Sequence, residues 1–275
     1  MNGVLDHVML RVEDLEESLE WYTTHLDYEE KGRWEADTFT NVYLGPENVH
    51  EQGAVLELTY NHDGRTYEMG DAWGHVAVRV PEDELEDVYH GLVDEGVGDY
   101  RPPEENPGYA FIRDPDGHEI ELVQRDHGEL FSLDHTMMRV ADADQALGYW
   151  TRKFEYEPTG RWEADSFANY FVKPQGAAEE AMAVELTYNY DVPTSDERSE
   201  EDVGARESAK RSLDGRTYDV GDAWGHLAVR ADDLGDAWET LMTREAPDYR
   251  DPESCDWNYA FTKDQDGHEI EIVER

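Results

Sequence analysis

Apolar and polar residues alternate along several short segments of the chain, the pattern expected of β-strands with one buried face. In residues 4–12, His7, Met9 and Arg11 fall on one face, and apolar residues fall on the other. Four further segments are expected to be strands: 55–60, 75–80, 109–112 and 119–123. These strands predict sheets that bury one face and carry polar side chains on the other.

Two segments of the first half predict helices. Asp14 is a suitable N-cap, Glu17 follows three residues later as in a capping box, and apolar residues continue at helical spacing as far as Leu26. A second helix is expected from about residue 84 to residue 95. The sequence Asp-Pro-Asp-Gly at 114–117 suits a tight turn between the last two strands. The pattern predicts an α+β fold with mostly antiparallel, curved sheets.

The chain repeats itself once. Five strings recur closely in the same order: 6–12 as 134–140, 32–37 as 160–165, 57–61 as 185–189, 70–75 as 221–226 and 116–121 as 266–271. The copies lie 128 residues apart before the fourth string and about 150 apart from it onward, so the second copy carries an insertion. We therefore predict one module at 1–128, a second at 129–275, and a polar, acidic surface insertion at about 191–214.

Charge excludes several function classes. The chain has 67 acidic and 23 basic residues, a net charge of -44, which disfavours binding to nucleic acid or to anionic membranes. Such a surface is typical of a protein adapted to high salt, where ions screen the repulsion. Aromatic residues make up 11% of the chain, which argues against an acidic disordered protein.

The remaining composition favours a cytoplasmic protein. No apolar stretch is long enough to span a membrane, and the first residues lack the pattern of a signal peptide. Cys255 is the single cysteine, which excludes an internal disulfide and a cysteine-rich zinc site.

Histidine and glutamate recur at matching positions within the predicted strands. The candidate metal ligands are His7, Glu57, His75 and Glu121 in the first copy and His135, Glu185, His226 and Glu271 in the second. A carboxylate in an otherwise apolar strand is costly to bury unless it is paired or binds a metal. Two imidazoles and two carboxylates suit a divalent first-row ion. Alternatively, a single histidine in a strand is a hydrogen-bonded core residue, and duplication alone preserves some of the repeated context.

The strings His-x-Met-Leu-Arg-Val, Glu-Leu-Thr-Tyr-Asn, Gly-His and Asp-Pro-Asp-Gly followed by Glu-Ile-Glu-Leu resemble those of glyoxalase I (lactoylglutathione lyase), a family of the vicinal oxygen chelate superfamily. The resemblance extends over nearly all of each of the two copies, apart from the acidic insertion. It implies tandem modules built from four βαβββ units, and a monomer whose halves act as a pseudo-dimer. It also implies two crossed sites, each with one divalent ion (nickel, cobalt or zinc, with manganese or iron as alternatives). Site 1 would be His7, Glu57, His226 and Glu271, and site 2 would be His75, Glu121, His135 and Glu185.

The resemblance further implies a reaction. The hemithioacetal of methylglyoxal and a small thiol would be isomerised to an S-lactoyl thioester, which detoxifies 2-oxoaldehydes. Glu121 and Glu271 would move the proton between adjacent carbons, with Glu57 and Glu185 as ligands that assist from the opposite side. Substrate-binding residues implied for the γ-glutamyl end of the thiol are Arg11, Asn61, Arg139 and Asn189. For Arg11, a structural salt bridge is the alternative.

One departure from the family pattern concerns the thiol. Asp71 and Asp222 stand where some members carry a basic residue for the glycine carboxylate of glutathione. A thiol without glycine, such as γ-glutamylcysteine, is therefore an alternative to glutathione. Other functions on the same scaffold also stay open: a metal-dependent epimerase or dioxygenase, or a metal-free protein that binds a small molecule.

Overall fold

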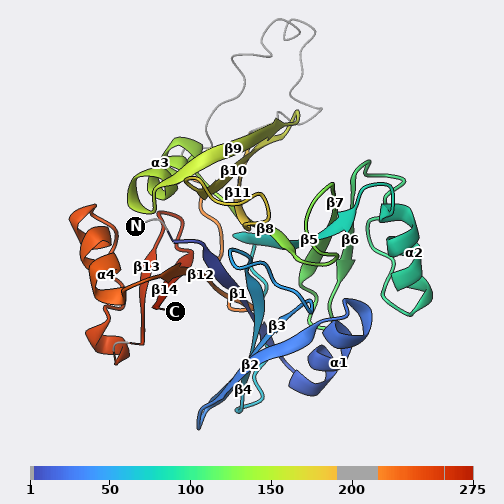
Figure 1. Ribbon diagram of the computed structural model, residues 1–275, viewed down its shortest axis with the longest axis horizontal. Helices are drawn as coiled ribbons and strands as arrows, with labels where there is room; N and C mark the ends of the chain where they lie inside the picture. Colours follow the sequence, from blue (N-terminus) through green and yellow to red (C-terminus); the bar gives the residue numbers. More distant parts are fainter. Residues whose placement is uncertain (1–2, 191–215, 257, 275) are drawn as a thin grey trace, which may run out of the picture.

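The computed structural model describes residues 3–190, 216–256 and 258–274 (Figure 1). The insertion predicted at about 191–214 lies outside these residues. The strands are β1 (Leu5–Val12), β2 (Glu29–Glu35), β3 (Phe39–Gly45), β4 (Val55–Asn61), β5 (Trp73–Pro81), β6 (Tyr109–Arg113), β7 (Glu119–Arg125), β8 (Leu133–Arg139), β9 (Tyr156–Glu163), β10 (Phe167–Pro174), β11 (Ala183–Asn189), β12 (Trp224–Ala231), β13 (Tyr259–Lys263) and β14 (Glu269–Glu274). The helices are α1 (Leu15–His25), α2 (Leu85–Asp94), α3 (Ala143–Lys153), α4 (Leu234–Thr243) and the short 3₁₀ helix η3 (Glu253–Cys255). The predicted α+β fold is confirmed.

The described strands form two mixed sheets of seven strands each. One has the order β13-β14-β12-β1-β4-β3-β2, and the other has the order β6-β7-β5-β8-β11-β10-β9. The central contacts, β1 with β12 and β5 with β8, are antiparallel. Each sheet therefore combines strands from both halves of the chain. Helices α1 and α2 lie on one side of the molecule, and α3 and α4 lie on the other (Figure 1).

Along the central strands, successive side chains alternate between the apolar core and a cavity on the other face of the sheet. In β1, Val8, Leu10 and Val12 are at most 1% exposed and join the apolar core. The side chains of His7 and Met9 point to the opposite, concave face, where they line a cavity. The same alternation therefore builds the core and places polar groups inside the cup of the sheet.

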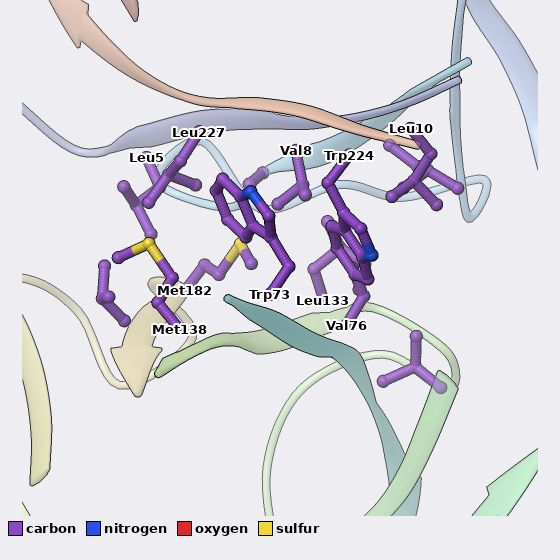
Figure 2. Packing of buried hydrophobic residues seen from close by; sticks show 14 of the residues in the cluster. Leu5, Val8, Leu10, Trp73, Val76, Leu133, Met138, Met182, Trp224 and Leu227 are labelled. Carbon is purple, nitrogen blue, oxygen red and sulfur yellow. The ribbon is translucent and has the colours of Figure 1, made fainter. Parts of the chain in front are cut away.

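Two tryptophans hold the sheets together at the centre. The indoles of Trp73 and Trp224 stack with their centroids 5.5 Å apart and an angle of 5° between the rings (Figure 2). Leu5, Val8 and Leu227 lie beside them toward one sheet, with Met138 and Met182 toward the other (Figure 2). This contact joins the two copies through burial of large apolar side chains.

The loops that precede the tryptophans pair with each other. Asp71 N–H donates to the carbonyl of Asp219 (2.7 Å), and Asp222 N–H donates to the carbonyl of Glu68 (2.8 Å). The carboxylate of Asp71 accepts from Asp219 N–H, and that of Asp222 from Glu68 N–H, both at 2.6 Å. Gly70 has φ +67°, and a Cβ there would lie 2.3 Å from the Asp219 carbonyl. Asp71 and Asp222 thus hold the loops together.

Within the described residues, no helix is long and apolar enough to cross a membrane.

Candidate metal centres

The structure brings the four residues of site 1 together from opposite ends of the chain. His7 Nε2 lies 2.8 Å from Glu57 Oε2, 3.1 Å from Glu271 Oε2 and 2.9 Å from His226 Nε2. His226 Nε2 lies 3.5 Å from Glu57 Oε2 and 3.2 Å from Glu271 Oε2. All four side chains are buried. Strands β1, β4, β12 and β14 each contribute one of them.

Site 2 repeats this arrangement in the other sheet. His135 Nε2 lies 2.8 Å from Glu185 Oε2, 3.0 Å from Glu121 Oε2 and 3.2 Å from His75 Nε2. His75 Nε2 lies 3.1 Å from Glu121 Oε2 and 3.5 Å from Glu185 Oε2. These side chains are also buried.

The geometry of site 1 fits a divalent cation at its centre. Metal–ligand bonds of about 2.0–2.2 Å place neighbouring ligand atoms roughly 2.8–3.6 Å apart around a four- or six-coordinate ion. Glu57 Oε2 is buried and accepts no hydrogen bond from the described residues, although it faces both imidazoles. The Nδ1 atom of His7 lies 2.9 Å from Asp6 Oδ2, which leaves the Nε2 lone pair free to face the centre. Asp134 does the same for His135 at 2.8 Å.

Electrostatics at site 1 favour positive charge between the four groups. Burial acts to lower the pKa of His7, but Glu57, Asp6 and Glu271 outweigh it and raise that pKa well above its ordinary value. Burial likewise acts to raise the pKa of Glu271, but interactions with His226 and His7 outweigh it and lower that pKa to about 2. The carboxylates are therefore ionised at neutral pH, as ligands must be.

Comparison with known proteins identifies the family. A model of the Glyoxalase/Bleomycin resistance protein/Dioxygenase superfamily matches residues 4–122 and again 132–272. The chain belongs to this superfamily. The resemblance found in the sequence is thereby confirmed, and the double match agrees with two modules of glyoxalase type.

Two curated relatives in the superfamily come from Arabidopsis thaliana. The protein named lactoylglutathione lyase GLX1 is 32% identical over 197 residues, which cover 68% of this chain and 67% of the relative. A probable chloroplastic lactoylglutathione lyase is 28% identical over 86% of this chain, which spans only 61% of that relative. The crystal structure of glyoxalase I from Zea mays matches 99% of this chain and 92% of its own with a TM-score of 0.76. At 22% identity, this structural likeness shows the shared fold.

Each centre of this glyoxalase-superfamily chain opens into a cavity, of about 590 Å³ at site 1 and about 700 Å³ at site 2. Arg11 and Asn61 line the first cavity, and Arg139 and Asn189 line the second. Arg11 Nη1 donates to two backbone carbonyls, those of Asp222 (2.7 Å) and Trp224 (2.8 Å). Within the described part of the chain, Arg11 forms no ion pair, so its structural contacts are to the backbone.

The amides of the predicted binding pairs also have partners. Asn61 Nδ2 donates to the hydroxyl of Tyr67 (2.7 Å), and Asn189 Nδ2 donates to that of Tyr218 (3.0 Å). Arg139 Nη1 donates to the carbonyls of Asp71 (2.9 Å) and Trp73 (2.7 Å). These contacts fix all three side chains at the cavity walls.

Sequence reasoning missed several residues of the cavities. Asn41 donates to Glu57 Oε1, and its counterpart Asn169 lines the second cavity. Arg250 lines the first cavity, where its guanidinium packs 3.8 Å from the Phe261 ring centroid, and Arg101 occupies the matching place in the second. The signal was present, because the string Phe-x-Asn at 39–41 recurs at 167–169 and Asp-Tyr-Arg at 99–101 recurs at 248–250.

Proposed function

We propose that this chain is a metal-dependent glyoxalase I with two sites. It isomerises the hemithioacetal of methylglyoxal and a small thiol into an S-lactoyl thioester. The observation that carries the proposal is the convergence of two imidazoles and two carboxylates on one centre, twice, in buried positions that open into substrate-sized cavities. Curated relatives named lactoylglutathione lyase support it.

The residues at each centre would hold one divalent ion, with nickel, cobalt and zinc as the candidates and manganese or iron as alternatives. When bound, the ion supplies positive charge for two neighbouring substrate oxygens, which stabilises the negative charge that develops as a proton leaves carbon. Two carboxylates balance the charge of a divalent ion, so a neutral site remains for the substrate.

Glu271 and Glu121 are the residues suited to move the proton. Their side chains are 10% exposed, against 2% for Glu57 and 4% for Glu185. Asn41 fixes Glu57, and Thr187 donates to Glu185 Oε1 (3.3 Å). In the described part of the chain, no such hydrogen bond reaches the Oε1 atoms of Glu271 and Glu121. A carboxylate that faces the cavity and keeps one oxygen free can take the proton from one carbon and return it to the next.

A basic side chain, Arg11, links the first cavity to an adjoining hollow, although the chain as a whole is strongly acidic. Arg11 lines both this cavity and an adjoining hollow, which Arg65 and Lys263 also line. Asp222 and Glu269 line the same hollow, Lys263 pairs with Glu269 (3.3 Å) and Arg65 pairs with Asp63, so Arg11 is the basic group best placed to meet an anionic thiol carrier. Because Asp71 and Asp222 are used to pair the loops, we propose γ-glutamylcysteine as an alternative carrier to glutathione.

The test is thioester formation from methylglyoxal with each thiol, by metal-loaded protein, by chelated protein, and after the metal is restored. The proposal predicts turnover that chelation removes and metal restores. Absence of thioester with both thiols in the metal-loaded protein would contradict it. A strong preference for glutathione would overturn the γ-glutamylcysteine alternative alone.

A further inference from the structure

The two carboxylates of site 1 differ in what holds their second oxygen. Asn41 Nδ2 donates to Glu57 Oε1, and Thr59 Oγ1 donates to Asn41 Oδ1 (3.0 Å). Because the amide oxygen accepts from this hydroxyl, the amide nitrogen is the end that faces the carboxylate. Glu57 Oε2 meanwhile faces the imidazoles of His7 and His226. One oxygen of this glutamate is therefore tied to a side chain of the neighbouring strand, and the other points to the centre.

Site 2 contains the same three residue types. Thr187 Oγ1 donates to Asn169 Oδ1 (3.0 Å) and also lies within donating distance of Glu185 Oε1 (3.3 Å). Asn169 and Thr187 are buried, as are their counterparts Asn41 and Thr59, 128 residues earlier. The donor is an amide in one site and a hydroxyl in the other. In both sites, a neighbouring polar side chain holds Oε1 of one glutamate, which we call the tied carboxylate.

The second glutamate of each site has no such neighbours. Two positions after the tied carboxylate of site 1, the strand carries a threonine whose ladder partner is an asparagine. Two positions after Glu271, the strand carries Val273, whose ladder partner is Tyr259. Val123 and Tyr109 form the same pair in site 2. A valine side chain cannot donate, and within the described residues neither tyrosine donates to the glutamate. We call Glu271 and its counterpart in site 2 the untied carboxylates.

The tied and untied carboxylates lie on opposite sides of each centre. In the strand order β14-β12-β1-β4, Glu271 on β14 and Glu57 on β4 flank the two strands that carry the histidines. The reacting carbon of a hemithioacetal is stereogenic, because it carries hydrogen, hydroxyl, sulfur and a carbonyl carbon. A base on one side of the centre therefore faces the C–H bond of only one of its two configurations.

We propose that the pairs Asn41 with Thr59 and Asn169 with Thr187 are positioning residues that reserve one glutamate of each centre for the metal. Each site then consumes one configuration of the hemithioacetal. This inference rests on the proposed function, which it deepens. The other configuration reacts only after thiol and aldehyde separate and recombine in solution.

The proton balance of the step is simple. The untied carboxylate takes the C–H proton and returns it to the adjacent carbonyl carbon. The hydroxyl proton passes to the oxygen of that carbonyl, so the first carbon becomes the thioester carbonyl and the second becomes the alcohol. The C–S bond stays intact, and no oxidant or reductant is needed.

The test uses a chain in which His75→Ala and His135→Ala remove site 2. Metal-loaded protein, in excess, is mixed with the preformed hemithioacetal of methylglyoxal, and the thioester is followed over time. We expect a fast phase that accounts for about half of the adduct, since only one configuration presents its C–H bond to the base. A slow phase follows at the rate of recombination in solution, independent of protein concentration. Asn41→Leu, similar in size but without a donor, releases Glu57, so the fast phase should grow toward the whole.

Metal affinity is a second readout that needs no turnover. Asn41→Leu should weaken binding of a divalent ion roughly 10- to 100-fold, measured by competition with a chelator, because the tied carboxylate loses the group that orients it. Thr59→Val should shift both readouts in the same direction by less, and it replaces Asn41→Leu if that variant fails to fold. Tyr259→Phe is the matched control beside the untied carboxylate and should leave the affinity at its native value.

The outcomes separate this inference from the proposed function. A single fast phase that consumes all of the adduct in the native site would overturn the inference. A native metal affinity or an unchanged fast phase in the Asn41→Leu variant would overturn it as well. Failure of the metal-loaded native chain to form any thioester would instead count against the proposed function.

Discussion

Two buried histidines outside the metal centres should make the stability of the protein depend on pH. His118 is fully buried; its Nδ1 lies 2.9 Å from Asp114 Oδ2 and its Nε2 lies 3.3 Å from the carbonyl of Ala223. Both ring nitrogens face acceptors, which favours the doubly protonated imidazolium. Burial acts to lower the pKa of His118, but Asp114 outweighs it and raises the pKa. His268 repeats this arrangement with Asp264 and the carbonyl of Ala72.

The sign follows from the raised pKa. A histidine whose pKa is higher in the folded state stabilises the fold fully below the unfolded value of about 6.5. This stabilisation is lost as the pH rises toward the folded pKa, at about 1.4 kcal/mol per pH unit for each histidine, hence about 2.8 kcal/mol per unit for the pair. Replacing His118 by Gln should halve that slope.

The same substitution should also destabilise the fold at low pH. Breaking a buried ion pair by removing one partner costs about 3–5 kcal/mol. Tyr22 Oη (2.9 Å) and the His118 backbone N–H (2.8 Å) still donate to Asp114, so we expect a loss near 3 kcal/mol at pH 6. The assay is denaturant unfolding of metal-loaded protein between pH 6 and pH 9 in high salt, with His268→Gln as the matched variant. A slope equal to that of the native chain in either variant would refute the reasoning.

Two further predictions concern catalysis and packing. Glu271→Gln and Glu121→Gln should each abolish one site's share of thioester formation, and the double variant should lower turnover about 10²- to 10⁴-fold; a double variant with native kcat would contradict this role. Gly70→Ala should cost about 3 kcal/mol because its Cβ would meet a backbone carbonyl at positive φ. Gly74→Ala should cost only about 1 kcal/mol, since its Cβ would meet the flexible end of Met137, and thermal unfolding of the two variants compares them.

Much of the fold was predictable because the alternation of apolar and polar residues and the repeated strings can both be read directly from the sequence. The predicted strand at 4–12 appears as Leu5–Val12, and the helix expected from Asp14 appears as Leu15–His25, with Asp14 accepting from the N–H groups of Glu16 and Glu17. Contacts between segments far apart in the chain could not be predicted from the sequence in the same way. Periodicity places His7 and Arg11 on one face of a strand, but it cannot show that the neighbouring strand is β12.

The partners of polar side chains were equally hidden from the sequence. Arg11 was expected to bind substrate or form a salt bridge, and its structural partners are backbone carbonyls, which no motif encodes. Asp71 serves a loop contact that depends on the opposite copy. The boundary between modules at 128 and 129, the monomeric state, the cytoplasmic location and adaptation to high salt stay predictions.

Metal stoichiometry in paired histidine variants tests the crossed arrangement of the centres most directly. His7→Ala with His226→Ala removes both imidazoles of one proposed centre, whereas His7→Ala with His75→Ala removes one imidazole from each. We predict that the first variant retains one tightly bound divalent ion per chain and the second retains none. One ion in the second variant and none in the first would show that each centre forms within a single copy, and would contradict the account.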